Sequence, residues 1–305
     1  MDILSQYTYE IPAIRTNLYR ILNHGKLAGT GKIIILPVDQ GFEHGPDASF
    51  LVNPAAYDPL YHLDLAIDSG VNAYAAPLGM LEAAAAYKPG AVPMILKLNS
   101  NNSLKSKENQ PHQAITASVE DALKLGCIGV GFTIYPGSNN CDEMLEQAQR
   151  LFQQAKNLGL VSVIWSYPRG AGIKDEASLD TISYGAHIGA LTGAHIIKVK
   201  LPNNSITNSK LDYPSMINLA ERVKHIKKCT FNSRRIVLFS GGSKKGRQSL
   251  LEEIREIKSG GGDGSIIGRN IFQRSKSEAI ELIDDMVKIY KNEENKRVDG
   301  GSGRS

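Results

Sequence analysis

The feature that most constrains this chain is a strand-like run followed by a helix-like run, which recurs from Lys32 onward. The units are spaced at roughly 25–35 residues, as in proteins that alternate strands with helices. The eight strands are expected at Ile33–Val38, Ala73–Ala76, Met94–Leu98, Gly129–Ile134, Val161–Ser166, Ile196–Lys200, Ile236–Phe239 and Ser265–Ile267. The clearest helical patterns lie at Asp142–Asn157, Leu179–Leu191, Tyr213–Ile226, Ser249–Lys258 and Ser277–Lys291.

An uninterrupted series of this kind predicts an α/β fold, a single-domain (β/α)₈ TIM barrel, whose usual size is about 250 residues. A doubly wound open sheet is the competing interpretation, but it usually has about six strands. We expect residues 1–30 to form an N-terminal leader with one helix near Ile14–Leu22, and residues 31–292 to form the barrel. Residues 293–305 are charged and then rich in Gly and Ser, which predicts a disordered tail.

Charge and cysteine usage exclude several classes of protein. The 35 basic and 31 acidic residues give a net charge of +4, which is too balanced to indicate nucleic-acid binding. The 3 cysteines form no CxxC pair, which favours a reducing compartment. The first residues do not resemble a secretory signal, and no run reaches the roughly 18 apolar residues of a membrane span. We therefore expect a cytoplasmic protein.

The histidines do not predict a metal site. They are scattered, without HxH or HxxxH spacing and without a matching carboxylate cluster. They lie at His24, His44, His62, His112, His187, His195 and His225. A mechanism without a metal is therefore favoured.

The strand Ile196–Lys200 carries two lysines, which is unusual for an apolar run. Side chains alternate along a strand, so Lys198 and Lys200 point to one face and Ile197 and Val199 to the other. An edge strand with a solvated face is the alternative. Burial beside a second cation lowers the pKa of a lysine and makes its amine a nucleophile towards carbonyls. Our hypothesis is a Schiff-base lysine.

Other reactive side chains fall at the ends of predicted strands, where barrel enzymes carry their active sites. Asp39 ends the first strand and could move protons or pair with a lysine. At the end of the third strand, Lys97 is more simply explained as a surface-edge residue. The fifth strand ends with Trp165, which would supply a wall, and with Tyr167, whose phenol could relay a proton, especially when nearby cations lower its pKa. Arg169 suits a phosphate.

Glycine turns follow the last two strands. Ser240, Gly241 and Gly242 follow the seventh strand, and Gly268 and Arg269 follow the eighth. Glycines let backbone N–H groups approach an anion, and these two positions form the usual phosphate site of barrel enzymes.

These motifs as a set resemble the archaeal-type (DhnA-like) class I fructose-bisphosphate aldolases, which also occur in bacteria. The resemblance runs from about Lys32 to Met286 and is carried by residues 36–46, 165–170, 197–200, 240–242 and 268–270. It implies a lyase that reversibly cleaves fructose 1,6-bisphosphate in glycolysis or gluconeogenesis. It implies no cofactor beyond a covalent Schiff base with the substrate, and a homo-oligomer, typically a decamer.

The resemblance also assigns roles to residues. It makes Lys198 the Schiff-base lysine, Tyr167 the acid/base and Asp39 a proton relay. The remaining matched positions would bind substrate or phosphate: Gln40, His44, Trp165, Arg169, Lys200, Ser240, Gly241, Gly242, Gly268 and Arg269. Gln40 stands where some relatives carry His, and residues 46–59 exceed a minimal loop, so they could cover the mouth or contact another subunit.

Two alternatives remain open. A transaldol or thiolase-like relative would keep the lysine and the phosphate site. A catalytically silent barrel would bind a sugar phosphate as a sensor or scaffold, without the need for Lys198 or Tyr167.

Overall fold

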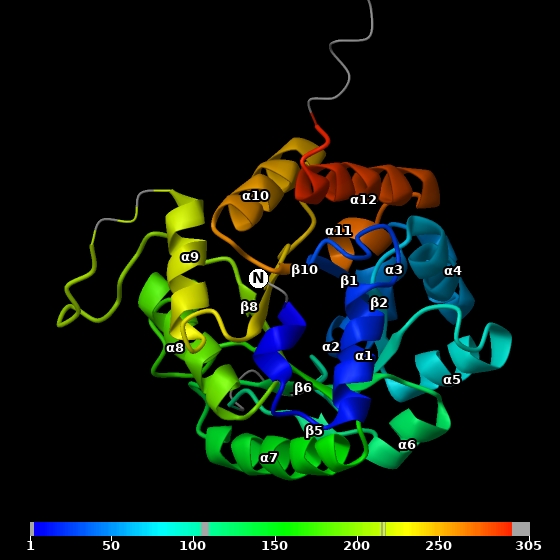
Figure 1. Ribbon diagram of the computed structural model, residues 1–305, viewed down its shortest axis with the longest axis horizontal. Coiled ribbons are helices and arrows are strands. Elements are labelled where there is room, and N and C mark those ends of the chain that lie inside the picture. Colours follow the sequence, from blue (N-terminus) through cyan, green and yellow to red (C-terminus); the bar gives the residue numbers. More distant parts are fainter. Residues whose placement is uncertain (1–2, 105–109, 215, 217, 295–305) are drawn as a thin grey trace, which may run out of the picture.

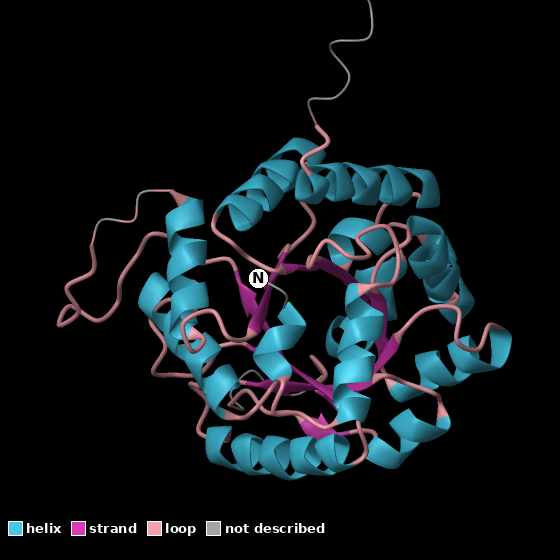
Figure 2. Ribbon diagram, in the orientation of Figure 1, coloured by secondary structure: helices cyan, strands magenta, loops and turns pink. Residues whose placement is uncertain are grey.

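The computed structural model describes residues 3–104, 110–214, 216 and 218–294. Eight parallel strands close into a barrel in the order β1-β2-β3-β6-β7-β8-β9-β10, with β10 paired to β1 (Figures 1 and 2). Their bounds are β1 Ile33–Pro37, β2 Ala73–Ala76, β3 Met94–Lys97, β6 Gly129–Ile134, β7 Val161–Ser166, β8 Ile196–Lys200, β9 Ile236–Ser240 and β10 Gly264–Ile266. The predicted (β/α)₈ barrel is confirmed, and each strand end lies within one residue of its predicted place.

Helices surround the ring of strands, as Figure 2 shows. They are α2 Gln40–His44, α3 Pro46–Phe50, α4 Pro59–Ser69, α5 Leu78–Tyr87, α6 Val119–Lys124, α7 Cys141–Asn157, α8 Leu179–Leu191, α9 Leu219–Cys229, α10 Arg247–Ser259, α11 Arg269–Phe272 and α12 Lys276–Lys291. The helix predicted at Tyr213–Ile226 begins late, at Leu219, and this part of the prediction is wrong. The side chains of Asn218 and Glu221 form a capping box that fixes the start of α9.

Alternation along the strands separates two cores. Inward-facing residues, such as Ile33, Val163 and Ile196, pack inside the barrel. Outward-facing residues, such as Ile197 and Val199, pack against the helices. Alternation then places the other residues of β8, Lys198 and Lys200, on the inward face, as the sequence predicts.

The N-terminal leader covers the end of the barrel where the strands begin. It consists of η1 (Ile3–Tyr7) and α1 (Pro12–Leu22), which lie across the ring in Figure 1. Buried side chains of both elements join the inner core. The Tyr7 hydroxyl donates to the carbonyl of His195 at 2.6 Å, and the Glu10 carboxylate lies 3.0 Å from the His195 ring. The opposite, C-terminal end of the barrel is left for the site.

Two local features fix the chain that pairs with β1 and the chain that follows it. Gly264 has φ of 145°, and a Cβ there would lie 1.9 Å from the carbonyl oxygen of Ile33, so the β10–β1 closure requires glycine. Within residues 46–59, α3 is followed by η2 (Pro54–Tyr57), and Asn53 donates to the carbonyls of Phe272 and Arg274 at 2.8 Å each. This segment is therefore tied to α11 rather than left as a long loop.

A small antiparallel pair, β4 (Asn99–Ser100) and β5 (Ala114–Ile115), follows β3. The predicted tail, 293–305, lies outside the described residues apart from its first two positions. Among the helices that the structure describes, none has the length and apolar character needed to cross a membrane.

Candidate active site

A cavity of about 310 Å³ opens at the C-terminal ends of the strands. The predicted site residues that line it come from β8 and from the segments at or after the ends of β1, β7, β9 and β10. They are Asp39, Gln40, His44, Tyr167, Arg169, Lys198, Lys200, Ser240, Gly241, Gly242, Gly268 and Arg269. Trp165 is the exception, because it lies below the cavity with 1% of its surface exposed. The barrel thus brings together residues that are up to 230 positions apart in the chain, Asp39 and Arg269.

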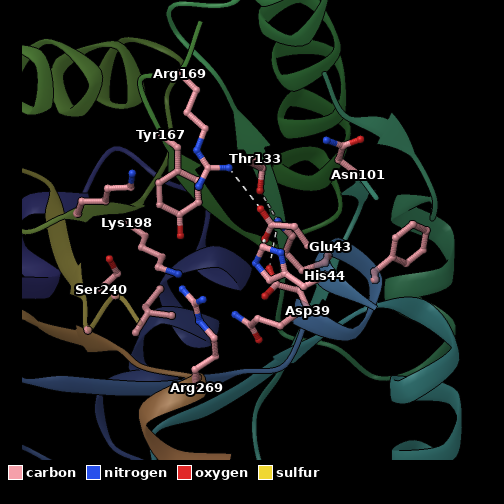
Figure 3. Close-up of a pocket in the computed structure, with 18 of the residues that line it drawn as sticks. Asp39, Glu43, His44, Asn101, Thr133, Tyr167, Arg169, Lys198, Ser240 and Arg269 are labelled. Carbon is pink, nitrogen blue, oxygen red and sulfur yellow. Dashed lines mark hydrogen bonds and ion pairs between the residues drawn. The ribbon is translucent and has the colours of Figure 1, made fainter. Parts of the chain in front are cut away.

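Lys198 extends from the inward face of β8 into this cavity. It is 5% exposed, and Figure 3 shows its amine directed towards the Tyr167 hydroxyl and the Arg269 guanidinium. Burial lowers the pKa of Lys198 from 10.5 to about 8, and the charges of Lys97 and Arg269 act in the same direction. The carboxylates of Asp39 and Glu43 oppose that shift. About a tenth of the amine is therefore unprotonated at pH 7, roughly a few hundred times more than for a lysine of ordinary pKa.

Lys97 is a second buried amine in the same cavity. It is 2% exposed, so the interpretation as a surface-edge lysine is wrong. Its amine donates to the Thr133 hydroxyl, lies 3.9 Å from the Asp39 carboxylate and stands 4.4 Å from the centre of the Trp165 ring. Burial lowers the pKa of Lys97, while Asp39 and Glu43 raise it. Trp165 therefore forms the floor on which this amine rests.

Tyr167 faces the Lys198 amine, which lies 5.4 Å from the centre of its ring. Burial raises the pKa of Tyr167 well above its usual range, and Asp39 and Glu43 add to this effect. Arg169 acts in the opposite direction but is outweighed. Nearby cations therefore do not lower the pKa of Tyr167 overall, and at neutral pH its side chain is a phenol with a proton to donate.

The two cations at the rim are held by carboxylates. Glu176 accepts from the Lys200 amine at 2.5 Å and lies 3.5 Å from Nε of Arg169. Glu43 contacts the other side of the Arg169 guanidinium at 3.3 Å and lies 3.8 Å from the His44 ring. Arg169 also stacks near the rings of Tyr135 and Tyr167, at 5.3 and 5.2 Å from their centres. This side of the cavity is thus polar but nearly balanced in charge.

The glycine turns after β9 and β10 are held together by Asn270. Its side chain donates to the carbonyls of Gly241 and Ser243 and accepts from the backbone N–H of Lys245 at 2.9 Å. Gly242 has φ of 69°, and a Cβ at Gly268 would lie 2.6 Å from the Pro37 carbonyl oxygen. Both turns therefore require glycine, and they leave a concave backbone surface beside Arg269 where an anion would fit.

The sequence offered Lys97, Asn99 and Glu43 only as weak candidates. Other lining residues were not found from the sequence: Asn101, Gln113, Thr133, Tyr135, Lys245 and Glu253. Thr133 lies on β6 and Tyr135 directly follows it. These two residues alternate in the same way as Lys198 and Lys200, so the alternation could have predicted that they face the cavity. Among the residues described, no three His, Cys, Asp or Glu side chains are grouped so as to hold a metal ion.

Comparison with known proteins gives consistent results. The sequence profile of the DeoC/LacD aldolase family matches residues 33–274. The "fructose-bisphosphate aldolase class 1" of Thermoproteus tenax is 36% identical, over 81% of this chain and 86% of that protein. The "probable fructose-bisphosphate aldolase class 1" of Chlamydia muridarum is 35% identical, over 90% of this chain and 83% of its own. A solved archaeal fructose-1,6-bisphosphate aldolase, with its catalytic Lys covalently bound to the carbinolamine intermediate of the substrate, superposes with a TM-score of 0.77. It is 31% identical and is matched over 90% of this chain and 98% of the other.

Proposed function

The chain belongs to the DeoC/LacD family of aldolases, and from that premise we propose that it is a class I, Schiff-base fructose-1,6-bisphosphate aldolase. It reversibly cleaves the bisphosphate to dihydroxyacetone phosphate and glyceraldehyde 3-phosphate. The observation that carries the proposal is a buried amine of lowered pKa, that of Lys198, which shares a barrel mouth with two glycine turns.

Lys198 forms the covalent intermediate. Its neutral amine attacks the C2 ketone of the open-chain sugar and gives a carbinolamine. Asp39 carries one amine proton to the carbinolamine oxygen, Tyr167 donates a second proton to the same oxygen, and water leaves. The product is an iminium cation beside a Tyr167 phenolate. With its raised pKa, Tyr167 is protonated at neutral pH and holds the proton that the leaving water needs, and the positive charge of the new iminium stabilises the phenolate that results.

Cleavage of the C3–C4 bond follows from that ion pair. The phenolate takes the proton of the C4 hydroxyl, the C3–C4 electron pair moves into the iminium, and glyceraldehyde 3-phosphate departs. An enamine remains on Lys198. Tyr167 then protonates C3 of the enamine, and hydrolysis of the new iminium releases dihydroxyacetone phosphate. Each proton moves between groups that line one cavity.

The glycine turns hold the C1 phosphate. The backbone N–H groups around Gly241, Gly242 and Gly268 and the Arg269 guanidinium would fix this phosphate, and so place the ketone beside Lys198. Positioning of this kind is worth on the order of several kcal/mol of activation barrier. Gln40, His44, Arg169 and Lys200 would contact the remainder of the sugar phosphate. Trp165 supports the lysines from below and does not reach the substrate cavity.

Homo-oligomeric assembly and a cytoplasmic location rest on the sequence, and they belong to this proposal only as predictions. The transaldol and thiolase-like alternatives share the lysine chemistry and differ in substrate. The substrate is therefore the property to test.

The test is a cleavage assay on the purified protein with a panel of sugar phosphates, run with and without a chelator. We expect fructose 1,6-bisphosphate to be the best substrate, activity to survive the chelator, and Lys198→Ala to abolish turnover. Turnover only of another sugar phosphate or of an acyl donor would favour the alternatives. Loss of activity on chelation would contradict the proposed chemistry.

A further inference from the structure

Lys97 is a buried cation that the mechanism above does not use. It comes from β3, whereas Asp39 follows β1 and Lys198 lies on β8. In the closed barrel, β2 separates β3 from β1, and β6 and β7 separate β3 from β8. Three contacts hold its amine in place: the Thr133 hydroxyl, the Asp39 carboxylate and the face of Trp165. Gly131 gives this arrangement room, because a Cβ there would lie 2.5 Å from the Trp165 ring and 3.2 Å from Cδ of Lys97. A lysine with so many dedicated contacts is more than packing.

The charges in the cavity are unequally distributed. The Lys198 amine lies over the same Trp165 ring as Lys97, at 5.7 Å from its centre, but no carboxylate lies within ion-pair distance of it among the described residues. Asp39, the carboxylate that most favours a charged Lys198, is the one that Lys97 contacts. Protonated Lys198 would therefore be a second buried cation competing for one shared counter-ion, an arrangement that disfavours its charged form.

We propose that Lys97 is a positioning residue that holds Asp39 as its own counter-ion and thereby increases the fraction of the Lys198 amine that is uncharged and nucleophilic. This inference rests on the proposed function, because it concerns the residue that would form the Schiff base. The sequence suggested Lys200, the other lysine of β8, as the cation beside Lys198. The inference gives that role to Lys97. The amine of Lys200 is instead engaged by Glu176 at the rim.

The other charged groups around Lys198 are fixed by their own partners or act weakly. Glu43 on α2 is engaged by Arg169, and Arg169 and Lys200 are engaged by Glu176. Arg269 on α11 adds to the repulsion, and Tyr167 after β7 stays neutral because its pKa is raised. The adjacent strands, β7 and β9, face Lys198 with Trp165 and Leu238, which carry no charge. Burial has the largest effect on the Lys198 amine, and among the charged groups around it Lys97 and Asp39 are the pair with the strongest influence.

The test is the pH dependence of Schiff-base trapping with dihydroxyacetone phosphate and cyanoborohydride. The trapping rate reports the fraction of Lys198 amine that is neutral, and it does not depend on cleavage of the C3–C4 bond. In Lys97→Met, which keeps the length of the side chain and removes its charge, Asp39 becomes free to pair with Lys198. We expect the acidic limb of the trapping rate to move up by about one pH unit or more, which leaves about tenfold less neutral amine at pH 7. Lys97→Arg keeps the charge and should restore most of the wild-type profile.

Lys245→Met is the matched control, because it removes a cation of the same cavity that has a different counter-ion, Glu253. Its acidic limb should stay within about 0.3 pH units of the wild type, on the same scale of pKa effects. An unchanged limb in soluble, trapping-competent Lys97→Met overturns the inference, as does an equal shift in Lys245→Met. If Lys97→Met does not fold, Asp39→Asn is the substitute test. Loss of the Asp39 carboxylate must then move the acidic limb to lower pH. An unchanged limb, or a limb moved to higher pH, overturns the inference. If the wild-type protein traps no adduct at all, the proposed function fails and not merely the role of Lys97.

Discussion

The buried amine of Lys198 should cost the folded protein stability, and replacing it should recover that cost. Lys198 is 5% exposed, and its pKa falls from 10.5 to about 8 on burial. Each pKa unit corresponds to about 1.4 kcal/mol, so the shift represents about 3 kcal/mol of unfavourable free energy in the charged state. Lys198→Met removes the charge at similar length, and we expect an inactive protein that is more stable than the wild type at pH 7.

The dependence on pH distinguishes this effect from a change in packing. The folded-state pKa of Lys198 lies below the unfolded one, so the penalty is complete below pH 8 and disappears as the pH rises above 10.5. The advantage of Lys198→Met should therefore be about 3 kcal/mol at pH 7 and roughly half of that at pH 9.5. A change in packing would add the same amount at both pH values.

Urea unfolding at the two pH values, followed by the fluorescence of the single tryptophan, measures the difference. Lys200→Met is the control, since its amine contacts Glu176 at the rim, where its side chain is 30% exposed. Such partly exposed ion pairs contribute up to about 1 kcal/mol, so its effect should be small. A Lys198→Met protein that is no more stable than the wild type at pH 7, or whose advantage does not change with pH, would refute the reasoning.

Two further predictions follow from other contacts. Tyr167→Phe removes the proton donor for dehydration and cleavage but not the nucleophile, so kcat should fall by about 10²–10⁴ and trapping on Lys198 should slow but still give the same adduct, whereas a complete absence of adduct would point to misfolding instead. Glu10→Gln weakens the tie between the leader and the barrel, and should lower the free energy of unfolding at pH 7 by about 1–3 kcal/mol. The hydrogen bond from His195 lowers the pKa of Glu10 from 4.5 to about 2, so in the wild type this contribution is present above pH 4.5 and is lost as the pH falls towards 2. Unfolding curves of the two proteins should therefore converge in acid, and a constant gap across that range would count against the His195–Glu10 interaction.

The barrel and the Schiff-base lysine were predictable because both depend on local periodicity. Alternation in β8 is a property of five consecutive residues, and it suffices to place Lys198 on the inward face. The order of the strands then places Asp39 and Arg269 at the same end of the barrel, although they are far apart in sequence. In both cases the sequence predicts which face or end of the barrel a side chain lies on, but not its distances to the other side chains.

The errors concern quantities that depend on the surroundings. The burial of Lys97 was not predicted because it depends on Thr133 and Trp165, which come from two other strands. The direction of the pKa shift of Tyr167 could not be predicted either, because burial by the whole barrel mouth outweighs the charge of Arg169 two residues along the chain. The late start of α9 reflects the Asn218–Glu221 capping box, which decides the boundary more strongly than the apolar pattern before it.

The central claim is that the amine of Lys198 becomes covalently joined to the substrate. Borohydride reduction in the presence of dihydroxyacetone phosphate, followed by peptide mass mapping, tests it directly. The account predicts one reduced adduct, on the peptide that carries Lys198, absent in Lys198→Met and present in Lys200→Met. An adduct on Lys200 or Lys97 in the wild-type protein would contradict it.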